Sequence, residues 1–153
     1  SCDMESIKAM QEIARASGCK GMIGGQAIDL RSELESMDEE SLLFMYKGKT
    51  AALIQASIIS GAILGGADPE HIEKLRDFGL RLGLAYQIQD DLLDDEKDES
   101  IEKCTYLSFH SKEEAERKVL ELSNRAVSIL DSLDGVDTSF FRDLTLELAG
   151  RQV

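Results

Sequence analysis

Proline and tryptophan are almost missing from this sequence. Pro69 is the single proline, and there is no tryptophan. Proline is the strongest helix breaker, so long helical stretches can run here with only glycines and short acidic patches to interrupt them. The pattern of apolar residues gives strands almost no support. We therefore expect an all-α fold, a helical bundle, over the 153 residues.

Basic residues are also scarce. The chain has 17 lysines and arginines against 30 aspartates and glutamates, a net charge of −13. A nucleic-acid partner needs a basic surface to neutralise its phosphates, so the composition argues against nucleic-acid binding. Anionic membrane surfaces are disfavoured for the same reason. The acidic excess is compatible with metal-ion binding, although solubility is the simpler explanation.

Cysteines are few, and long apolar runs are lacking. Cys2, Cys19 and Cys104 lie far apart without a CxxC or Cys/His spacing, so no zinc site is expected. They fit a reducing compartment, and we expect a cytoplasmic protein. No apolar run reaches the ~18 residues that a membrane-spanning helix needs. No signal peptide is visible, and the abrupt start leaves a missing N-terminal segment open.

Apolar spacing and helix-end signals predict five helical segments. They are expected over residues 4–30, from the N-cap Asp38 to residue 64 with an irregularity at KGKT, from residue 69 after the N-cap Asp68 to residue 94, from the N-cap Ser111 to residue 133, and over residues 138–150. The first segment contains Gly18, Gly21, Gly24 and Gly25. A glycine inside a helix costs roughly 1 kcal/mol relative to alanine. We therefore expect a neighbouring helix or a ligand to approach closely there.

The third segment ends in QDDLLDD, an unusual density of carboxylates beside an apolar stripe. The expected stripe consists of Ile72, Leu75, Phe78 or Gly79, Leu82, Tyr86 and Leu93. Gln87, Asp90 or Asp91, and Asp94 recur three or four residues apart, so they share one helix face next to this stripe. Like charges on one face repel unless a cation neutralises them, and Mg²⁺ prefers carboxylates and phosphates as ligands. A solvated acidic helix end is the alternative, and spacing alone does not decide between the two.

An EF-hand beginning at Asp94 is excluded. Glu99 stands where the calcium loop needs glycine, and Thr105 stands where it needs the closing glutamate.

Two lysines are candidates for holding a diphosphate on the far side of such a metal. Lys49 lies in YKGKTAAL, where a glycine loosens the helix. Backbone carbonyls around Lys49 and Thr50 would then escape helical bonding and could face a positive charge. Lys103 follows the acidic stretch in EKCTY. Each lysine, taken singly, is more simply a surface residue.

Four stretches together resemble the trans-isoprenyl diphosphate synthases, the polyprenyl synthetase family that includes farnesyl and geranylgeranyl diphosphate synthases. In order, they are GMIGGQAIDL, YKGKTAALI, GLAYQIQDDLLD and KCTY. The resemblance implies an isoprenoid-synthase fold, a bundle around a deep apolar cavity where Mg²⁺ holds an allylic diphosphate. The allylic cation left by ionisation is attacked by isopentenyl diphosphate, giving a longer trans-prenyl diphosphate. A homodimer is also implied.

The resemblance assigns residues to the metal and to the cavity wall. The second aspartate-rich motif of the family is DDxxD preceded by glutamine, and it is matched by Gln87, Asp90, Asp91 and Asp94. Asp90 would be the main Mg²⁺ ligand, and Asp91 and Asp94 would act by direct contact or through water. Gln26, on the substrate side, and Asp29 would shape the cavity wall.

The resemblance also assigns residues to the substrate. Lys49 and Lys103 would grip the allylic diphosphate, and Thr50 and Gln87 would line the allylic cation. The loop between Asp98 and Lys103 is shorter than is usual in the family. We expect loop residues to be missing there rather than a genuine deletion.

Two parts of the family pattern are absent: the first aspartate-rich motif and the basic loop that binds isopentenyl diphosphate. We therefore expect residues 1–153 to be the C-terminal portion of a polyprenyl synthetase domain, inactive as this piece alone. Product chain length cannot be read, because in this family it is set by residues before the missing motif. Two other functions stay open: a non-catalytic subunit that regulates another prenyl synthase, and an acidic helical domain without a ligand.

Overall fold

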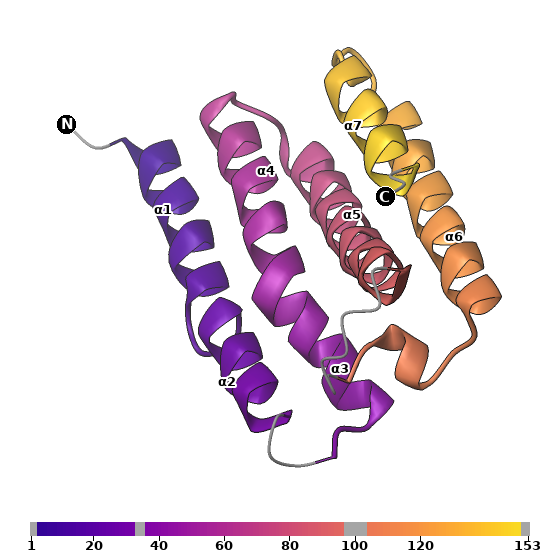
Figure 1. The fold of residues 1–153 in the computed structure, drawn as a ribbon. Helices are drawn as coiled ribbons and strands as arrows, with labels where there is room; N and C mark the ends of the chain where they lie inside the picture. Colours follow the sequence, from indigo (N-terminus) through magenta and orange to yellow (C-terminus); the bar gives the residue numbers. More distant parts are fainter. Residues whose placement is uncertain (1–2, 33–35, 97–103, 151–153) are drawn as a thin grey trace.

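The computed structural model describes residues 3–32, 36–96 and 104–150, and no strand occurs in these ranges (Figure 1). The all-α prediction is confirmed. The elements are α1 (Met4–Ser17), α2 (Met22–Ser32), α3 (Glu39–Tyr46), the π-helical turn η1 (Lys47–Ala51), α4 (Ala52–Leu64), α5 (Pro69–Glu96), the 3₁₀ turn η2 (Tyr106–Ser108), α6 (Lys112–Asp131) and α7 (Ser139–Ala149). None of the described helices is both long and apolar enough to cross a bilayer.

The predicted helix starts are confirmed by their capping hydrogen bonds. The Asp38 carboxylate accepts from the Ser41 N–H at 2.8 Å, and the Asp68 carboxylate accepts from the His71 N–H at 2.9 Å. Ser111 and Glu114 form a reciprocal capping box at the start of α6. Each cap satisfies N–H groups that a helix cannot satisfy internally.

The single helix predicted over residues 4–30 is wrong, because the chain breaks at residues 18–21. The N–H of Gly18 bonds back to the Arg15 carbonyl, and that of Gly21 bonds to the Gly18 carbonyl. A Cβ at Gly21 would lie 2.0 Å from the Ala16 carbonyl oxygen, so only glycine fits this tight turn. The glycines that the sequence placed inside one helix therefore include those that separate α1 from α2.

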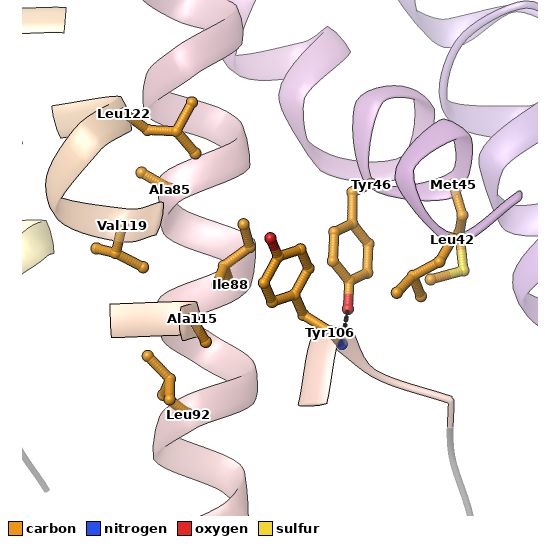
Figure 2. Packing of buried hydrophobic residues seen from close by; sticks show 10 residues of the cluster. All are labelled: Leu42, Met45, Tyr46, Ala85, Ile88, Leu92, Tyr106, Ala115, Val119 and Leu122. Carbon is orange, nitrogen blue, oxygen red and sulfur yellow. Dashed lines mark hydrogen bonds between the residues drawn. The ribbon is translucent and has the colours of Figure 1, made fainter. Parts of the chain in front are cut away.

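The helices α1, α4, α5 and α6 lie side by side, α7 packs beside α6, and α2 and α3 lie together at one end (Figure 1). Three groups of buried side chains hold this arrangement together. Ala9 meets Ile59 and Ile63 between α1 and α4, and Phe78 and Leu82 meet α6. The third group joins α3, α5, η2 and α6, and it includes Leu42, Tyr46, Ile88, Tyr106 and Val119 (Figure 2).

The buried face of α5 is wider than the predicted stripe. Phe78, Gly79 and Leu82 are buried as expected. The other predicted members, Ile72, Leu75, Tyr86 and Leu93, are half-buried, whereas Ala85, Ile88 and Leu92 are buried and were not predicted. The reason is that α5 packs against α4 on one side and α6 on another, so one narrow stripe cannot cover both contacts.

Helix α1 exposes most of its apolar side chains. Ile7, Met10 and Ile13 are 38%, 54% and 48% exposed, although their spacing is that of a buried helix face. Only Ala9 of this helix is buried. The contact between α1 and α4 therefore uses a small side chain, and the apolar stripe of α1 faces away from the core.

Candidate functional site

The π-helical turn η1 lies where the sequence predicted an irregularity at KGKT. Glycines on the neighbouring helices allow this turn to be approached from both sides. A Cβ at Gly25 would lie 2.4 Å from the Lys49 backbone nitrogen, and a Cβ at Gly83 would lie 2.5 Å from the Ala51 Cα. The predicted close approach at Gly25 is thereby confirmed. Short π-helical turns are frequent at functional sites, and this one holds Lys49 and Thr50 between α2 and α5.

Lys49 forms an ion pair with Asp29 of α2, with Nζ and Oδ2 separated by 2.5 Å. The Asp29 side chain is only 7% exposed, whereas that of Lys49 is 32% exposed. The carboxylate is therefore held in the interior, whereas the lysine side chain that pairs with it is partly exposed. This pair links α2 to η1.

Thr50 and Gln87 form the next link. The Thr50 hydroxyl donates to Gln87 Oε1 at 2.8 Å, and Gln87 Nε2 donates to Asp91 Oδ1 at 3.5 Å. Residues of η1 are thus connected to the aspartate-rich part of α5 through one amide side chain. The shared helix face predicted for Gln87 and Asp91 is consistent with this contact.

Asp91 is 7% exposed and accepts hydrogen bonds from elements far apart in the sequence. Its Oδ2 atom accepts from the Tyr46 hydroxyl and, at 2.9 Å, from the Tyr106 N–H. The same N–H also donates to the Tyr46 oxygen at 3.1 Å (Figure 2). Asp91 therefore joins α3, α5 and the turn η2 at one buried point.

Burial governs the ionisation of this cluster. Desolvation raises the pKa of Asp91, while hydrogen bonds from Tyr106, Tyr46 and Gln87 oppose that increase. Burial also raises the pKa of Tyr46, and the Asp91 charge adds to the effect. The Tyr46 hydroxyl accordingly stays protonated and acts as the donor toward Asp91.

Asp90 and Asp94 lie one helical turn apart on α5, and Asp90 is half-buried while Asp94 is exposed. No group of three or more His, Cys, Asp and Glu side chains that could hold a metal occurs among the described residues. Magnesium bound together with a substrate phosphate needs only one or two protein carboxylates. The oxygen donors of Asp90 and Asp94 fit that chemistry.

Other predicted residues are placed less centrally. Gln26 is exposed on α2. Lys103 lies outside the described residues. The same is true of the stretch between Asp98 and Lys103, where loop residues were expected to be missing. His110 stacks on the Tyr106 ring with centroids 4.3 Å apart, and its Nε2 atom lies 2.6 Å from Glu39 Oε1.

Tyr46 and Tyr106 were missed as site residues. Both stand inside motifs that had been singled out, YKGKTAAL and KCTY. The Tyr46 hydroxyl and the Tyr106 N–H meet although the two residues are 60 positions apart in the chain. No local periodicity signals such a contact, and the motif membership of both residues was the only available hint.

A hollow of about 570 Å³ opens between α1, α4 and α5, beyond η1. Its lining includes Ala52, Gln55, Glu12 and Arg76. Arg76 donates to both carboxylate oxygens of Glu12, at 2.9 and 3.1 Å, and this contact holds the pKa of Glu12 below its usual 4.5. With an ion pair on its wall, this hollow differs from the deep apolar cavity that the resemblance implies.

Residues 2–124 match the model of a family described as polyprenyl synthetase. The farnesyl diphosphate synthase of Geobacillus stearothermophilus is 32% identical over 152 residues, which cover 90% of this chain and 51% of that protein. The chloroplastic geranylgeranyl pyrophosphate synthase 3 of Arabidopsis thaliana is 46% identical over 91 residues, covering 58% of this chain and 25% of that protein.

Solved structures agree with these matches. An FPP/GFPP synthase from Zymomonas mobilis superposes with a TM-score of 0.86 at 32% identity, covering 94% of this chain and 51% of that one. A Helicobacter pylori geranyltransferase, complexed with magnesium and isoprenyl diphosphate, superposes with a TM-score of 0.75 at 29% identity and covers 95% of this chain and 50% of its own. The chain spans about half the length, or less, of these similar proteins.

Proposed function

Since the chain belongs to the polyprenyl synthetase family, we propose that it supplies the allylic-diphosphate side of a Mg²⁺-dependent prenyltransferase site. The reaction joins isopentenyl diphosphate to an allylic diphosphate and gives a longer trans-prenyl diphosphate. The observation that carries this proposal is the contact chain from η1 to α5, in which Thr50 bonds to Gln87 and Gln87 bonds to Asp91. It brings the lysine-threonine motif next to the aspartate-rich motif.

Asp90 and Asp94 are proposed to hold magnesium, directly or through water, because they offer carboxylates one turn apart. When bound, magnesium neutralises the diphosphate and so makes it a better leaving group. Lys49, whose side chain is partly exposed, is proposed to bind the allylic diphosphate with its ammonium group, and Asp29 holds the lysine in place. We propose the same substrate contact for Lys103, which the sequence motif alone supports.

Thr50 and Gln87 are proposed to stabilise the allylic cation. Both present oxygen atoms beside η1, whose π-helical geometry alters the usual pairing of backbone carbonyls. Preorganised dipoles aimed at developing charge lower a reaction barrier without reorganising during the reaction. Gln26, which is exposed on α2, is proposed to border the substrate.

We also propose that the chain is inactive alone, because it spans only about half the length of its bacterial relatives. The isopentenyl diphosphate pocket and further metal ligands would come from the remaining part of such a fold. A homodimer and a cytoplasmic location stay predictions of the sequence.

Thermal denaturation of the chain tests the binding half of this proposal. A ligand that binds only the native state raises the melting temperature. We expect Mg²⁺ together with inorganic diphosphate to raise it by several degrees, and Asp90→Ala to abolish most of the increase. Ser57→Ala, at an exposed position of α4, is a matched control that should keep the full shift. A melting temperature of the unsubstituted chain that Mg²⁺ and diphosphate leave unchanged would favour an acidic helical domain without a ligand.

A mixing assay tests the catalytic half. The chain is incubated with labelled isopentenyl diphosphate and dimethylallyl diphosphate, alone and with a candidate partner subunit. We expect product only in the completed assembly and loss of product with Asp90→Ala. Product that appears on mixing and survives Asp90→Ala would instead indicate a non-catalytic regulatory subunit.

A further inference from the structure

The buried carboxylate of Asp91 has an effect on Gln87 that follows from hydrogen-bond chemistry. An ionised carboxylate can only accept hydrogen bonds, so the Gln87 amide must turn its Nε2 end toward Asp91. The opposite end, Oε1, is thereby presented to η1. There it accepts the hydroxyl proton of Thr50 at 2.8 Å.

This arrangement also determines the direction of the Thr50 hydroxyl. A threonine hydroxyl carries one proton and two lone pairs. Because its proton is committed to Gln87, the Thr50 oxygen directs lone pairs, and not a proton, away from that bond. Lone pairs stabilise a neighbouring cation, whereas a hydroxyl proton pointing at it would repel it.

We propose that Asp91 is a positioning residue that acts through Gln87 to direct the lone pairs of Thr50 toward the allylic cation. The inference rests on the proposed function and gives Asp91 a role different from those of Asp90 and Asp94. Asp91 is 7% exposed, and its Oδ2 already accepts from Tyr46 and from the Tyr106 N–H. These donors hold the carboxylate inward, so its charge acts on Gln87.

An isosteric substitution reverses the chain of hydrogen bonds. In Asp91→Asn, the oxygen of the new amide takes the two donors from Tyr46 and Tyr106, and its NH₂ group faces Gln87. Gln87 must then turn its Oε1 toward position 91 and its Nε2 toward Thr50. The Thr50 hydroxyl becomes an acceptor, and its proton points toward the substrate.

Nuclear magnetic resonance detects this reversal in the chain without any ligand. In the parent protein we expect no NOE between the Gln87 side-chain NH₂ protons and the Thr50 side chain, and in Asp91→Asn we expect this NOE to appear. Tyr46→Phe removes one donor to Asp91 but leaves its charge, so it should keep the parent pattern. An NOE between the Gln87 NH₂ and Thr50 in the parent would overturn the proposed orientation by itself, even if Asp91→Asn failed to fold.

Kinetics test the functional consequence in the catalytically competent assembly. We expect Asp91→Asn to lower kcat about 10²-fold, the usual size of one lost transition-state dipole. The KM for the allylic diphosphate and the Mg²⁺ concentration for half-maximal rate should change less than about 3-fold, because binding groups are untouched.

The double variant Asp91→Asn with Gln87→Glu provides a rescue. The carboxylate introduced at position 87 accepts from both the amide at position 91 and Thr50, so the Thr50 proton again points away from the substrate. We expect this double variant to recover most of the lost kcat, whereas Gln87→Glu alone should be impaired because it places two carboxylates in contact. Such non-additivity is expected only if the two residues act together.

The outcomes separate this inference from the proposed function. An unchanged kcat in Asp91→Asn overturns the positioning role. A ten-fold higher Mg²⁺ requirement that the additional Gln87→Glu change does not rescue also overturns it and assigns Asp91 to the metal. If the assembly transfers no prenyl group at all, the proposed function fails, and the NOE pattern decides the orientation of Gln87 independently.

Discussion

At the scale of single residues, the most consequential feature is a charged side chain placed inside the core. Asp91 belongs to a motif whose acids were expected on one helix face beside the apolar stripe, and it is buried among Tyr46, Tyr106 and Gln87. A buried carboxylate is tolerated only when donors satisfy it. Asp90 of the same motif is half-buried, and Asp94 is exposed. The three aspartates of one motif therefore lie in different environments.

Removing one donor from this cluster should be measurable in stability. We expect Tyr46→Phe to lower the free energy of unfolding by about 2 kcal/mol, since a hydrogen bond to a charged group is lost in the core. Urea denaturation followed by circular dichroism measures the change.

Tyr106→Phe is the matched control for this experiment. It removes a hydroxyl from the same cluster but keeps the backbone N–H that Asp91 accepts. A loss for Tyr106→Phe as large as that for Tyr46→Phe would contradict the importance of the Tyr46 contact.

At the scale of elements, the position of η1 depends on glycines of other helices. Gly48 of the turn lies against Gly25 of α2, and Ala51 of the turn lies against Gly83 of α5. At both places the backbones are almost in contact. Small residues allow this approach because a Cβ would have to occupy space already filled by backbone atoms. The geometry of the lysine-threonine motif is therefore set partly by residues outside it.

Gly83→Ala should displace η1. Its Cβ would lie 2.5 Å from the Ala51 Cα, so the backbone must move, and we expect a loss of about 1–3 kcal/mol in stability. Binding of Mg²⁺ and diphosphate should weaken in parallel, as measured by the ligand-induced shift in melting temperature.

Gly61→Ala is the contrasting substitution in α4. Nothing lies within 4 Å of a Cβ built there. Alanine is the better helix former, so we expect a gain of up to about 1 kcal/mol. Equal losses at both glycines would show that helix contacts are not the cause.

At the scale of the whole molecule, α1 packs mainly along α4, and it does so without burying its large apolar side chains. Ala9 packs on α4, and Glu12 forms a double hydrogen bond with Arg76 of α5, while Ile7, Met10 and Ile13 stay exposed. The chain also spans about half the length of its bacterial relatives. The arrangement of its helices nevertheless follows theirs, with a TM-score of 0.86 for one of them.

The Glu12–Arg76 pair gives the attachment of α1 a pH dependence. Hydrogen bonds from Arg76 hold the pKa of Glu12 below its usual 4.5. A lowered folded-state pKa contributes stability that is present above the usual value and is lost as the pH falls through the folded-state value. We expect Glu12→Gln to lower stability by about 1 kcal/mol at pH 7 and to have progressively less effect below pH 4. Denaturation curves from pH 3 to 7 measure this difference, and a constant difference across that range would contradict the assignment.

Features that depend on neighbours along the chain could be predicted from the amino-acid sequence. Helix caps at Asp38, Asp68 and Ser111 and the irregularity at KGKT are local features, since each is satisfied within a few residues. The motifs also identified the family, because their order along the chain can be recognised without knowing how the helices pack. The break at residues 18–21 is also a local feature. It was not predicted, because the helical spacing of the apolar residues was given more weight than the glycines.

Which side chains meet is visible only once the helices are packed together. The wide buried face of α5, the exposed stripe of α1 and the pairing of Lys49 with Asp29 depend on which helices pack together. The inward position of Asp91 depends on Tyr46 and Tyr106, which come from other elements. Helical periodicity defines faces of a single element, whereas burial and hydrogen bonding arise from the faces of several elements brought into contact.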